Sequence, residues 1–336
     1  FNYQNPKEVL SLGGGQVTIS GTGSGTHGVV MQNLDLLSTA GSLNVYGGTG
    51  GVSLGDRGVR FGSDAAGAVT SSTASLTIRG DDLEYNDLSF GFSNSLESTG
   101  AVVMESHSSS FSSAFDYENF DLDPSVSSVR IGKTTNTANV VIKDPVAMAG
   151  PISIYGGDIL LEEDLTSTLS GADVLVKGRG DVEAVASRSF LTNNGDIVFW
   201  SNSDNSGVGS IKLGNDNVLN SSNGRSGDTD SGGGKITLGG GSGSGTSPTG
   251  YSSSSSAPGI KLGTSTSNHT QFYSGGGDIS IKGSSTATGL VDDRDESGIY
   301  QWGRMTMKSG RGAITMEGSS TDYQGIGFVA PVSESD

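Results

Sequence analysis

Three acidic stretches are the parts of this sequence best suited to chemistry. They are FDYENFDLDP at 115–124, LLEEDLT at 160–166 and LVDDRDESG at 290–298. Carboxylates at alternate positions of a loop can converge on Ca²⁺, which accepts six to eight oxygen ligands in flexible geometry. The calcium candidates are Asp116, Glu118, Asp121, Asp123, Asp292, Asp293 and Asp295. Neither an EF-hand loop nor the calcium-binding nonapeptide repeat occurs, so solvated loops are the simpler interpretation.

Histidine and cysteine chemistry is not indicated. His27, His107 and His269 lie far apart in Ser, Thr and Gly contexts, and no HxxxH or HExxH spacing would place two of them on one metal. The absence of cysteine removes disulfides, thiolate catalysis and thiolate metal sites. No GxSxG nucleophile elbow is present. We therefore expect no catalytic residue and no cofactor, with calcium as the one exception to test.

A polysaccharide-active site is the catalytic alternative. Such sites combine carboxylates with Lys or Arg, and Arg294, Arg304 and Arg311 are the available arginines near acidic stretches. Aromatic side chains could add a carbohydrate-stacking surface, made by Trp200, Tyr273, Tyr300, Trp302 and Tyr323. A cleft that gathers three or more carboxylates with a Lys or Arg would favour an enzyme. Acidic residues scattered on variable loops would favour a structural role.

The elements that must position these residues come from a repeat. A small residue followed by an apolar-x-apolar triplet occurs nine times, for example in GGGKITLGGG at 232–241 and GGGDISIKG at 275–283. The paired positions are Val17/Ile19, Leu43/Val45, Leu76/Ile78, Ile152/Ile154, Val174/Val176, Ile197/Phe199, Ile236/Leu238, Ile279/Ile281 and Ile314/Met316. Alternation places residues i and i+2 on one face, so each copy predicts a short strand whose paired residues point into the core.

Short strands separated by glycine-rich turns predict an all-β solenoid, in which each strand pairs in parallel with its equivalent one coil further along. We expect one elongated domain over 1–336 with very little helix, a loop-rich region at about 80–150 and a Gly/Ser-rich loop at about 239–259. The flanking glycines are expected to turn the corners, where positive φ angles are needed.

Charge and hydropathy exclude two classes of partner. The net charge of −17 argues against nucleic acid, because phosphate binding depends on Lys and Arg. No apolar stretch approaches the length of a membrane span, so we expect no membrane insertion within this chain. The sequence begins FNYQNPKEV without Met or a signal-peptide pattern, and we expect it to be a processed product or part of a longer protein.

Four phrases carry a resemblance to a known family. They are NGDIVFWSNSDNSGVGSIKLG (194–214), GGGKITLGGG (232–241), GGGDISIKGSSTATG (275–289) and GRGAITMEGSSTDYQGIGF (310–328). They resemble the repeat regions of large bacterial exoproteins of the filamentous-haemagglutinin type, most densely from about residue 150 onward. The resemblance implies a right-handed parallel β-helix, secretion to the medium or cell surface, and an adhesive or scaffolding role.

Together these features predict a non-enzymatic extracellular structural protein, either a cell-surface adhesin or a filament or scaffold built from stacked β-coils. The alternative is a polysaccharide-active lyase or hydrolase with a β-helix fold. The expected partners are other copies of the chain, in end-to-end or lateral contact, or glycans and proteins of a host or neighbouring surface. Uncapped solenoid ends expose sheet edges that favour such self-association.

Overall fold

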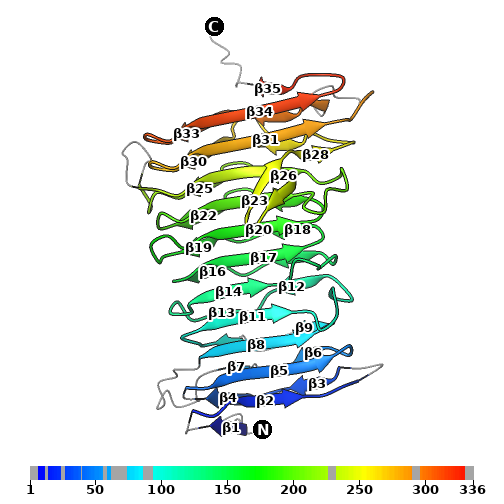
Figure 1. Ribbon diagram of the computed structural model, residues 1–336, viewed down its shortest axis with the longest axis vertical. Coiled ribbons are helices and arrows are strands. Elements are labelled where there is room, and N and C mark those ends of the chain that lie inside the picture. The colour runs from blue at the N-terminus through cyan, green and yellow to red at the C-terminus, as the bar shows by residue number, and fades with distance from the viewer. Residues whose placement is uncertain are drawn as a thin grey trace. The chain divides into compact units, whose positions relative to one another are not determined.

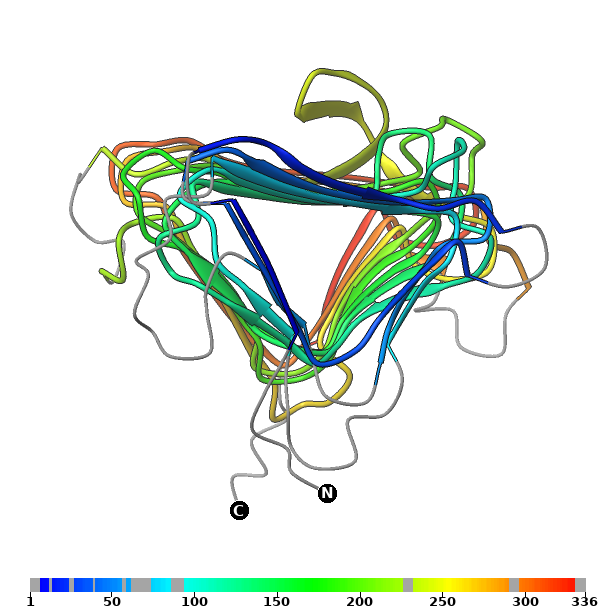
Figure 2. The ribbon, with the colours of Figure 1, turned by 90° about the horizontal axis from the view of Figure 1, so that it is seen from below.

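The regular secondary structure of this protein consists of strands. The computed structural model describes residues 7–11, 14–23, 27–38, 40–55, 59–61, 74–85, 94–225, 232–289 and 296–329, and these ranges contain no α-helix. The chain divides into two compact units, residues 1–155 and 156–336. Each unit is a right-handed parallel β-solenoid, which confirms the predicted fold (Figures 1 and 2). Both units share one architecture, and the sequence pattern alone indicated no division at residue 155.

In the first unit, successive coils add strands to parallel sheets. The sheet that carries the repeated apolar pairs, called the motif sheet below, contains β2 (Val17–Ser20), β5 (Ser42–Gly48), β8 (Ser75–Gly80), β11 (Ala101–Glu105), β14 (Ser128–Ile131) and β17 (Ile152–Gly156). A second sheet contains β1 (Lys7–Ser11), β4 (Leu34–Ser38), β7 (Val59–Phe61), β10 (Asn94–Leu96) and β13 (Phe120–Leu122). The remaining strands are β3 (Val29–Met31), β6 (Val52–Leu54) and β9 (Leu83–Tyr85), the pair β12 (Phe115–Tyr117) and β15 (Val140–Ile142), and β16 (Val146–Met148).

In the second unit, three sheets form the sides of a triangle around the core (Figure 2). The motif sheet contains β20 (Val174–Gly178), β23 (Ile197–Ser201), β26 (Ile236–Ser244), β31 (Ile279–Ser285) and β34 (Ile314–Ser320), with β27 (Ser247–Gly250) and β28 (Ser252–Ser254) attached. The next sheet contains β18 (Ile159–Leu161), β21 (Val182–Ala184), β24 (Ile211–Leu213), β29 (Ile260–Leu262), β32 (Ile299–Trp302) and β35 (Ile326–Val329). The last contains β19 (Leu165–Ser167), β22 (Ser189–Thr192), β25 (Val218–Asn220), β30 (His269–Tyr273) and β33 (Arg304–Lys308).

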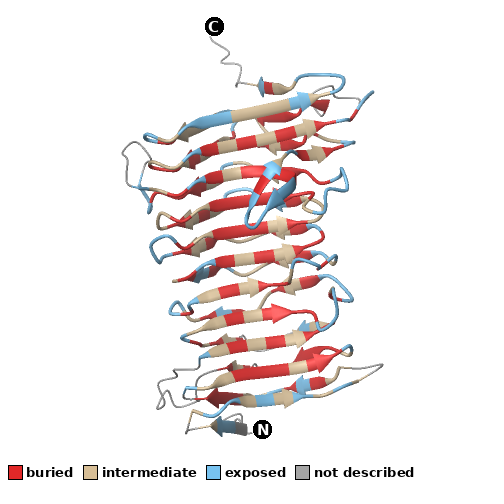
Figure 3. Ribbon diagram, viewed as in Figure 1, coloured by how far each residue is buried: buried red, intermediate tan, exposed pale blue. Residues whose placement is uncertain are grey.

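The repeated apolar pairs stack in register along the motif sheet. In the second unit Val174 pairs with Ile197, Ile197 with Ile236, and Ile236 with Ile279, so these residues form one continuous row. Buried segments recur along the strands of this sheet (Figure 3). Thirteen of the predicted core residues have no measurable exposure: Leu43, Val45, Leu76, Ile152, Ile154, Val174, Val176, Ile197, Phe199, Ile236, Leu238, Ile279 and Ile281.

Four predicted core residues at the ends of the repeat are less covered. Val17 and Ile19 are half-buried on β2, Met316 is half-buried on β34, and Ile314 is 47% exposed. The placement of Ile314 in a closed core is therefore wrong. The reason is that β34 pairs with β31 on one side, and no described strand covers its other side.

The region from 94 to 150, expected to be irregular, contains regular coils. Strands β11 and β14 continue the motif sheet, with Val102 pairing with Leu76 and with Val129. Val129 in turn pairs with Ile152. The long gap between the repeats at 76 and 152 therefore holds two further coils, whose triplets VVM and VRI lack the glycine-rich flanks.

Glycine in the repeat is required by close contact between coils. The residue two positions before each apolar pair is small, and in the second unit Gly195, Gly234 and Gly277 stack in one column. A Cβ atom on Gly195 would lie 2.0 Å from the carbonyl oxygen of Ala172, and one on Gly234 would lie 2.1 Å from that of Gly195. None of these three glycines has a positive φ, so close contact between coils is what requires glycine at these positions. Of the glycines that flank the apolar pair of this coil, Gly232 and Gly241 do have the positive φ predicted for corners, 68° and 62°.

The Gly/Ser-rich stretch at 239–259, predicted as a loop, forms a hairpin in its first half. Strand β26 runs beyond the sheet to Ser244 and pairs antiparallel with β27. The chain then returns to the sheet as β28, which pairs with β31 next to β26. The hairpin projects from the outer face of the motif sheet (Figure 2).

Candidate functional site

Four carboxylates line one groove on the outer surface of the first unit. The groove is bounded by β9 and β12 and the residues beside them, and it is lined by Asp82, Leu83, Glu84, Ser113, Ala114, Asp116 and Glu118. Residues on either side of the inward-facing Tyr117 point outward because strand side chains alternate, which places Asp116 and Glu118 in the groove. The groove thus gathers the three or more carboxylates that would favour an enzyme, but its lining contains no Lys or Arg.

Lys143 holds two of these carboxylates. It follows β15, the strand that pairs with β12, and its Nζ lies 2.5 Å from Asp116 Oδ2 and 3.2 Å from Glu118 Oε2. The hydrogen bond to Asp116 raises the pKa of Lys143; burial opposes this effect, and the carboxylate of Glu118 adds to it. Lys143 is therefore a firmly protonated ion-pair partner and is not suited to act as a base near neutral pH.

The other two carboxylates of the groove also have partners. His27 Nε2 lies 2.8 Å from Glu84 Oε2. Ser113 Oγ donates a hydrogen bond of 3.2 Å to Asp82 Oδ1. The groove is consequently lined by side chains that already interact with each other. It offers a negatively charged, open surface with one fixed cation.

The predicted calcium cluster at 115–124 is divided by a corner. Asn119 has a φ of 61°, and the chain turns there from β12 into β13, which belongs to a different sheet. Asp121 is exposed on β13, and Asp123 Oδ1 accepts a hydrogen bond of 2.7 Å from the backbone of Ser125. The described residues contain no group of three or more His, Asp or Glu side chains that could hold a metal ion. Asp292, Asp293 and Asp295 lie outside the described residues, and calcium binding stays a prediction.

The third acidic stretch, at 160–166, connects coils. Glu163 Oε2 lies 2.8 Å from Arg188 Nη1, and Asp164 Oδ1 accepts a hydrogen bond of 2.9 Å from the backbone of Ser189. Both partners are in the next coil. These carboxylates therefore stabilise the stacking of coils and form no separate site.

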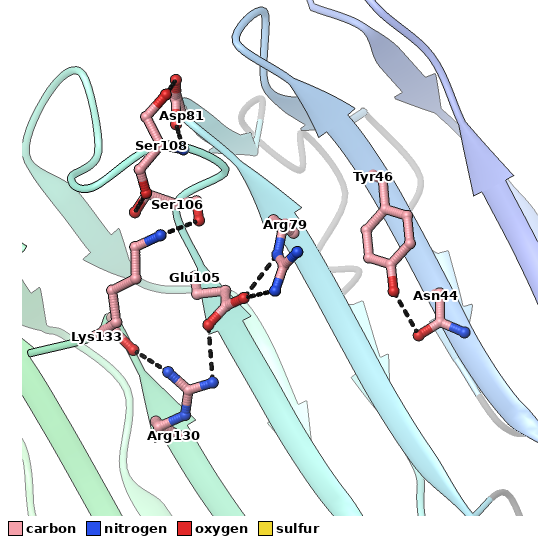
Figure 4. Close-up of polar contacts among 10 residues, drawn as sticks. Asn44, Tyr46, Arg79, Asp81, Glu105, Ser106, Ser108, Arg130 and Lys133 are labelled. Atoms are coloured by element: carbon pink, nitrogen blue, oxygen red, sulfur yellow. Dashed lines mark hydrogen bonds and ion pairs between the residues drawn. The ribbon is translucent and has the colours of Figure 1, made fainter.

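Sequence reasoning missed a buried ion-pair network in the first unit. Glu105, at the end of β11, is 4% exposed and lies between Arg79 and Arg130 of the two neighbouring coils (Figure 4). Arg79 Nε donates to Glu105 Oε1 at 2.6 Å, and Arg130 Nη2 donates to Oε2 at 2.8 Å. The residue three positions after the first residue of an apolar pair occupies an equivalent place in each coil. Comparing these residues between neighbouring coils would have placed Arg79 opposite Glu105, and likewise Lys282 opposite Glu317.

The predicted aromatic surface is not formed. Trp200 on β23 and Tyr300 on β32 belong to different sheets and are 2% and 1% exposed. The hairpin covers Trp200. The indole Nε1 of Trp200 donates to the Gly241 carbonyl at 3.0 Å, and the Lys177 ammonium lies 3.5 Å from the centroid of the Trp200 ring. Tyr323 is exposed in the β34–β35 turn, and Tyr273 is half-buried with its hydroxyl donating to Gln271.

The remaining histidines and arginines do not converge. His107 is exposed, and His269 Nε2 lies 2.8 Å from Thr306 Oγ1 in the second unit. Arg304 and Arg311 are exposed, and Arg294 lies outside the described residues. Among the described residues, the groove near Lys143 is thus the arrangement that comes nearest to an active site.

Comparison with known proteins adds no assignment. No protein-family model, curated protein or solved structure matches this chain. Within the described ranges there is no helix that is long and apolar enough to cross a membrane.

Proposed function

We propose that this protein is a non-enzymatic structural protein of the bacterial cell exterior, an adhesin or scaffold built from stacked β-coils. The proposal rests on the ion pairs that the carboxylates of this protein form. In the described residues, the ion pairs of Lys and Arg with Asp and Glu join neighbouring coils, as in Asp35–Arg60, Asp181–Lys212 and Glu317–Lys282. The charged groups of these pairs are bound into the scaffold, where they hold neighbouring coils together.

These ion pairs mainly fix the register of neighbouring strands. An exposed pair contributes about 0–1 kcal/mol, so each is weak by itself. A row of pairs along the coils, together with the apolar rows, specifies which strand lies against which. This property suits a protein whose function depends on presenting loops at fixed intervals, because the variable polar corners are then held in a regular array.

The proposed partners are glycans or proteins of a neighbouring surface and further copies of this chain. The net charge of −17 supports an acidic, well-solvated surface of the kind that keeps an extracellular protein soluble. Secretion to the medium or cell surface is part of the same proposal, and the resemblance to filamentous-haemagglutinin repeats supports it.

The groove supports a second candidate, a polysaccharide-active enzyme. Asp116 Oδ2 and Glu118 Oε2 both contact Lys143 Nζ, so they are near enough to act on one glycosidic bond. Against this stands the firm protonation of Lys143, which keeps both carboxylates in ion pairs. A substrate would have to displace Lys143 before either carboxylate could take part in chemistry.

One experiment separates the two candidates. Purified protein is incubated with a panel of acidic and neutral polysaccharides, and new chain ends are measured along with binding to the same polymers. Asp116→Asn tests the groove, and Asp181→Asn, which breaks an ion pair in the other unit, is the matched control. We expect no cleavage by any of the three proteins. Cleavage by the wild type and by Asp181→Asn, but not by Asp116→Asn, would establish the enzyme.

A further inference from the structure

One side of the first unit is interrupted between two adjacent coils. Strand β9 pairs with β6 and strand β12 pairs with β15, but β9 and β12 do not pair with each other. The strands before and after them do pair across the same two coils, β8 with β11 and β10 with β13. The described strands therefore leave an opening in the wall of this unit, and the groove described above lies along it.

An apolar cavity lies behind this groove. It has an empty volume of about 230 Å³, and its lining residues are Val52, Leu54, Ile78, Leu83, Glu84, Met104 and Phe120. The four side chains that β6, β8 and β11 contribute to this lining are at most 3% exposed, so the cavity extends into the core of the unit. Leu83 and Glu84 line both the cavity and the groove, so these two residues form the junction between core and surface.

The mouth of the cavity is negatively charged. Glu84 lies at the junction, and the groove beside it is lined by three further carboxylates. His27 Nε2 lies 2.8 Å from Glu84 Oε2. Among the described residues this ion pair uses one of the two carboxylate oxygens, and a carboxylate accepts hydrogen bonds through both. A cation that enters the groove would therefore meet a carboxylate acceptor next to an apolar space.

We propose that the first unit binds a small aliphatic amine in its protonated form, with the ammonium group on Glu84 and the alkyl group in the cavity. An inorganic cation would gain nothing from the apolar lining, and a neutral hydrocarbon would gain nothing from the carboxylates. The size of the cavity limits the alkyl group to a few carbon atoms. Met104 can adjust around it, because its side chain is unbranched and has three rotatable bonds. This proposal goes beyond the structural role proposed above and does not depend on it.

The test is an NMR titration of the full-length chain with methyl-, ethyl-, propyl- and butylammonium and with propanol. The methyl groups of Ile, Leu, Val and Met are labelled, so that Ile78 and Met104 report directly on the cavity. Affinity should rise about fourfold for each added methylene until the cavity is filled. Propanol lacks the charge and should bind about tenfold more weakly than propylammonium. Equal affinities for methylammonium and propylammonium, or shifts confined to methyl groups outside the cavity, would overturn the proposal.

Variants at two positions separate the effect of charge from that of shape. Glu84→Gln keeps the size of the side chain and should weaken binding of every ammonium ion about tenfold, with propanol unaffected. Val52→Ala enlarges the cavity and should lengthen the alkyl group that binds best, whereas Val52→Ile fills the cavity and should shorten it. Partial unfolding would weaken all ligands alike and could not produce these opposite shifts. Glu183→Gln, at an exposed position of β21 in the second unit, is the matched control and should bind like the wild type.

A peptide whose first residue is valine distinguishes a free amine from the N-terminus of another chain, because both present an ammonium group beside a short aliphatic group. The tripeptide Val-Gly-Gly should bind more weakly than propylammonium, since its remaining residues lose conformational freedom on binding. Tighter binding of the tripeptide would assign the site to chain termini and overturn the proposal of a free amine. Unchanged affinity for propylammonium in Glu84→Gln would equally contradict it. Circular dichroism of every variant shows whether the β-structure is retained.

Discussion

Trp200 lies beneath Gly241, with its indole Nε1 donating to the Gly241 carbonyl at 3.0 Å, although position 200 points to the outside of the motif sheet. Two other outward side chains of this sheet, Leu175 and Val198, are buried as well, at 3% and 4% exposure. The hairpin of β26 and β27 has Pro248 buried on its underside, and a Cβ atom on Gly243 would lie 2.6 Å from the Trp200 ring. The hairpin is thus packed onto the solenoid as a second, small hydrophobic layer.

Trp200→Ala should lower the free energy of unfolding by about 3–5 kcal/mol, because a large buried side chain is lost. Trp200→Phe retains most of the packing and leaves the Gly241 carbonyl without its donor, which should cost about 1–2 kcal/mol. Denaturant titration followed by circular dichroism measures both. Thr315→Ala, at an exposed outward position of β34, is the control and should change stability by less than about 0.5 kcal/mol. Equal stabilities for Trp200→Ala and the control would show that the hairpin is not packed on Trp200.

Glu105→Gln should destabilise the protein by about 1–3 kcal/mol at pH 7, because two arginines lose their charged partner. Burial raises the pKa of Glu105, but the hydrogen bonds and charges of Arg130 and Arg79 outweigh it, so the pKa falls below its ordinary value of 4.5. A lowered folded-state pKa means that the stabilisation is complete above pH 4.5 and is lost as the pH falls through the lower value. The difference between variant and wild type should therefore shrink in acid, as measured by urea unfolding at several pH values. A difference that stays constant down to about pH 2 would contradict the ion-pair account.

Asp173→Asn should raise the free energy of unfolding, the opposite of the effect expected for Glu105→Gln. Burial raises the pKa of Asp173 above its ordinary value of 3.8, and the charge of Asp196 in the next coil raises it further, against the lowering effect of the Asp196 backbone N–H. Ionised Asp173 is thus unfavourable in the folded state at neutral pH. The amide should stabilise the protein by about 0.3 kcal/mol at pH 7, because its oxygen can still accept the 2.7 Å hydrogen bond from Asp196 N–H. The gain should vanish below pH 3.8, where the wild-type carboxyl is neutral in both states. Destabilisation at pH 7 would show that the charge of Asp173 is needed.

Gly195→Ala should lower the free energy of unfolding by about 3 kcal/mol, because its methyl group would overlap the Ala172 carbonyl oxygen and force adjacent coils apart. Gly171 is the matched comparison. It has a φ of +77°, and no atom lies within 4 Å of the position that an alanine methyl group would take, so Gly171→Ala should cost about 1 kcal/mol for the left-handed backbone alone. Thermal unfolding of both variants provides the measurement. The reverse order of stability would show that coil contact is not what requires glycine in this column.

The sequence was sufficient to predict the strands because period-two alternation is a local signal. The register of Val174 on Ile197 follows from it, since shifting a strand by one residue would turn its apolar pair outward. The role of Gly195 was not predictable in this way, because the atom it must avoid belongs to Ala172 in the preceding coil. A single-residue corner at Asn119 was likewise invisible, and it separates Asp116 from Asp121.

Only part of the candidate site could be predicted from the sequence, because the rest of it depends on contacts between coils. Asp116 and Glu118 stand out in the sequence, but Lys143, which binds both, lies in the next coil of the solenoid. Glu84 and Asp82 reach the same groove from β9 and its preceding residue. Side chains that meet across coils are separated by a coil length that varies along this chain, so no fixed spacing identifies them. Ile314 illustrates the converse, because its sequence context is that of a core residue, whereas it is exposed on β34, which pairs with β31 alone among the described strands.

Strand β26 pairs with β31 up to Leu238 and with β23 up to Gly240, and after the hairpin the chain pairs with β31 again from Ser252. The hairpin is therefore inserted between two segments that pair with the same strand, and the coil that follows is not displaced. Residues 242–247 at its tip are exposed. This is a natural insertion point: foreign peptides placed between Ser244 and Ser247 would be displayed away from the solenoid while the stacking of its coils continued undisturbed.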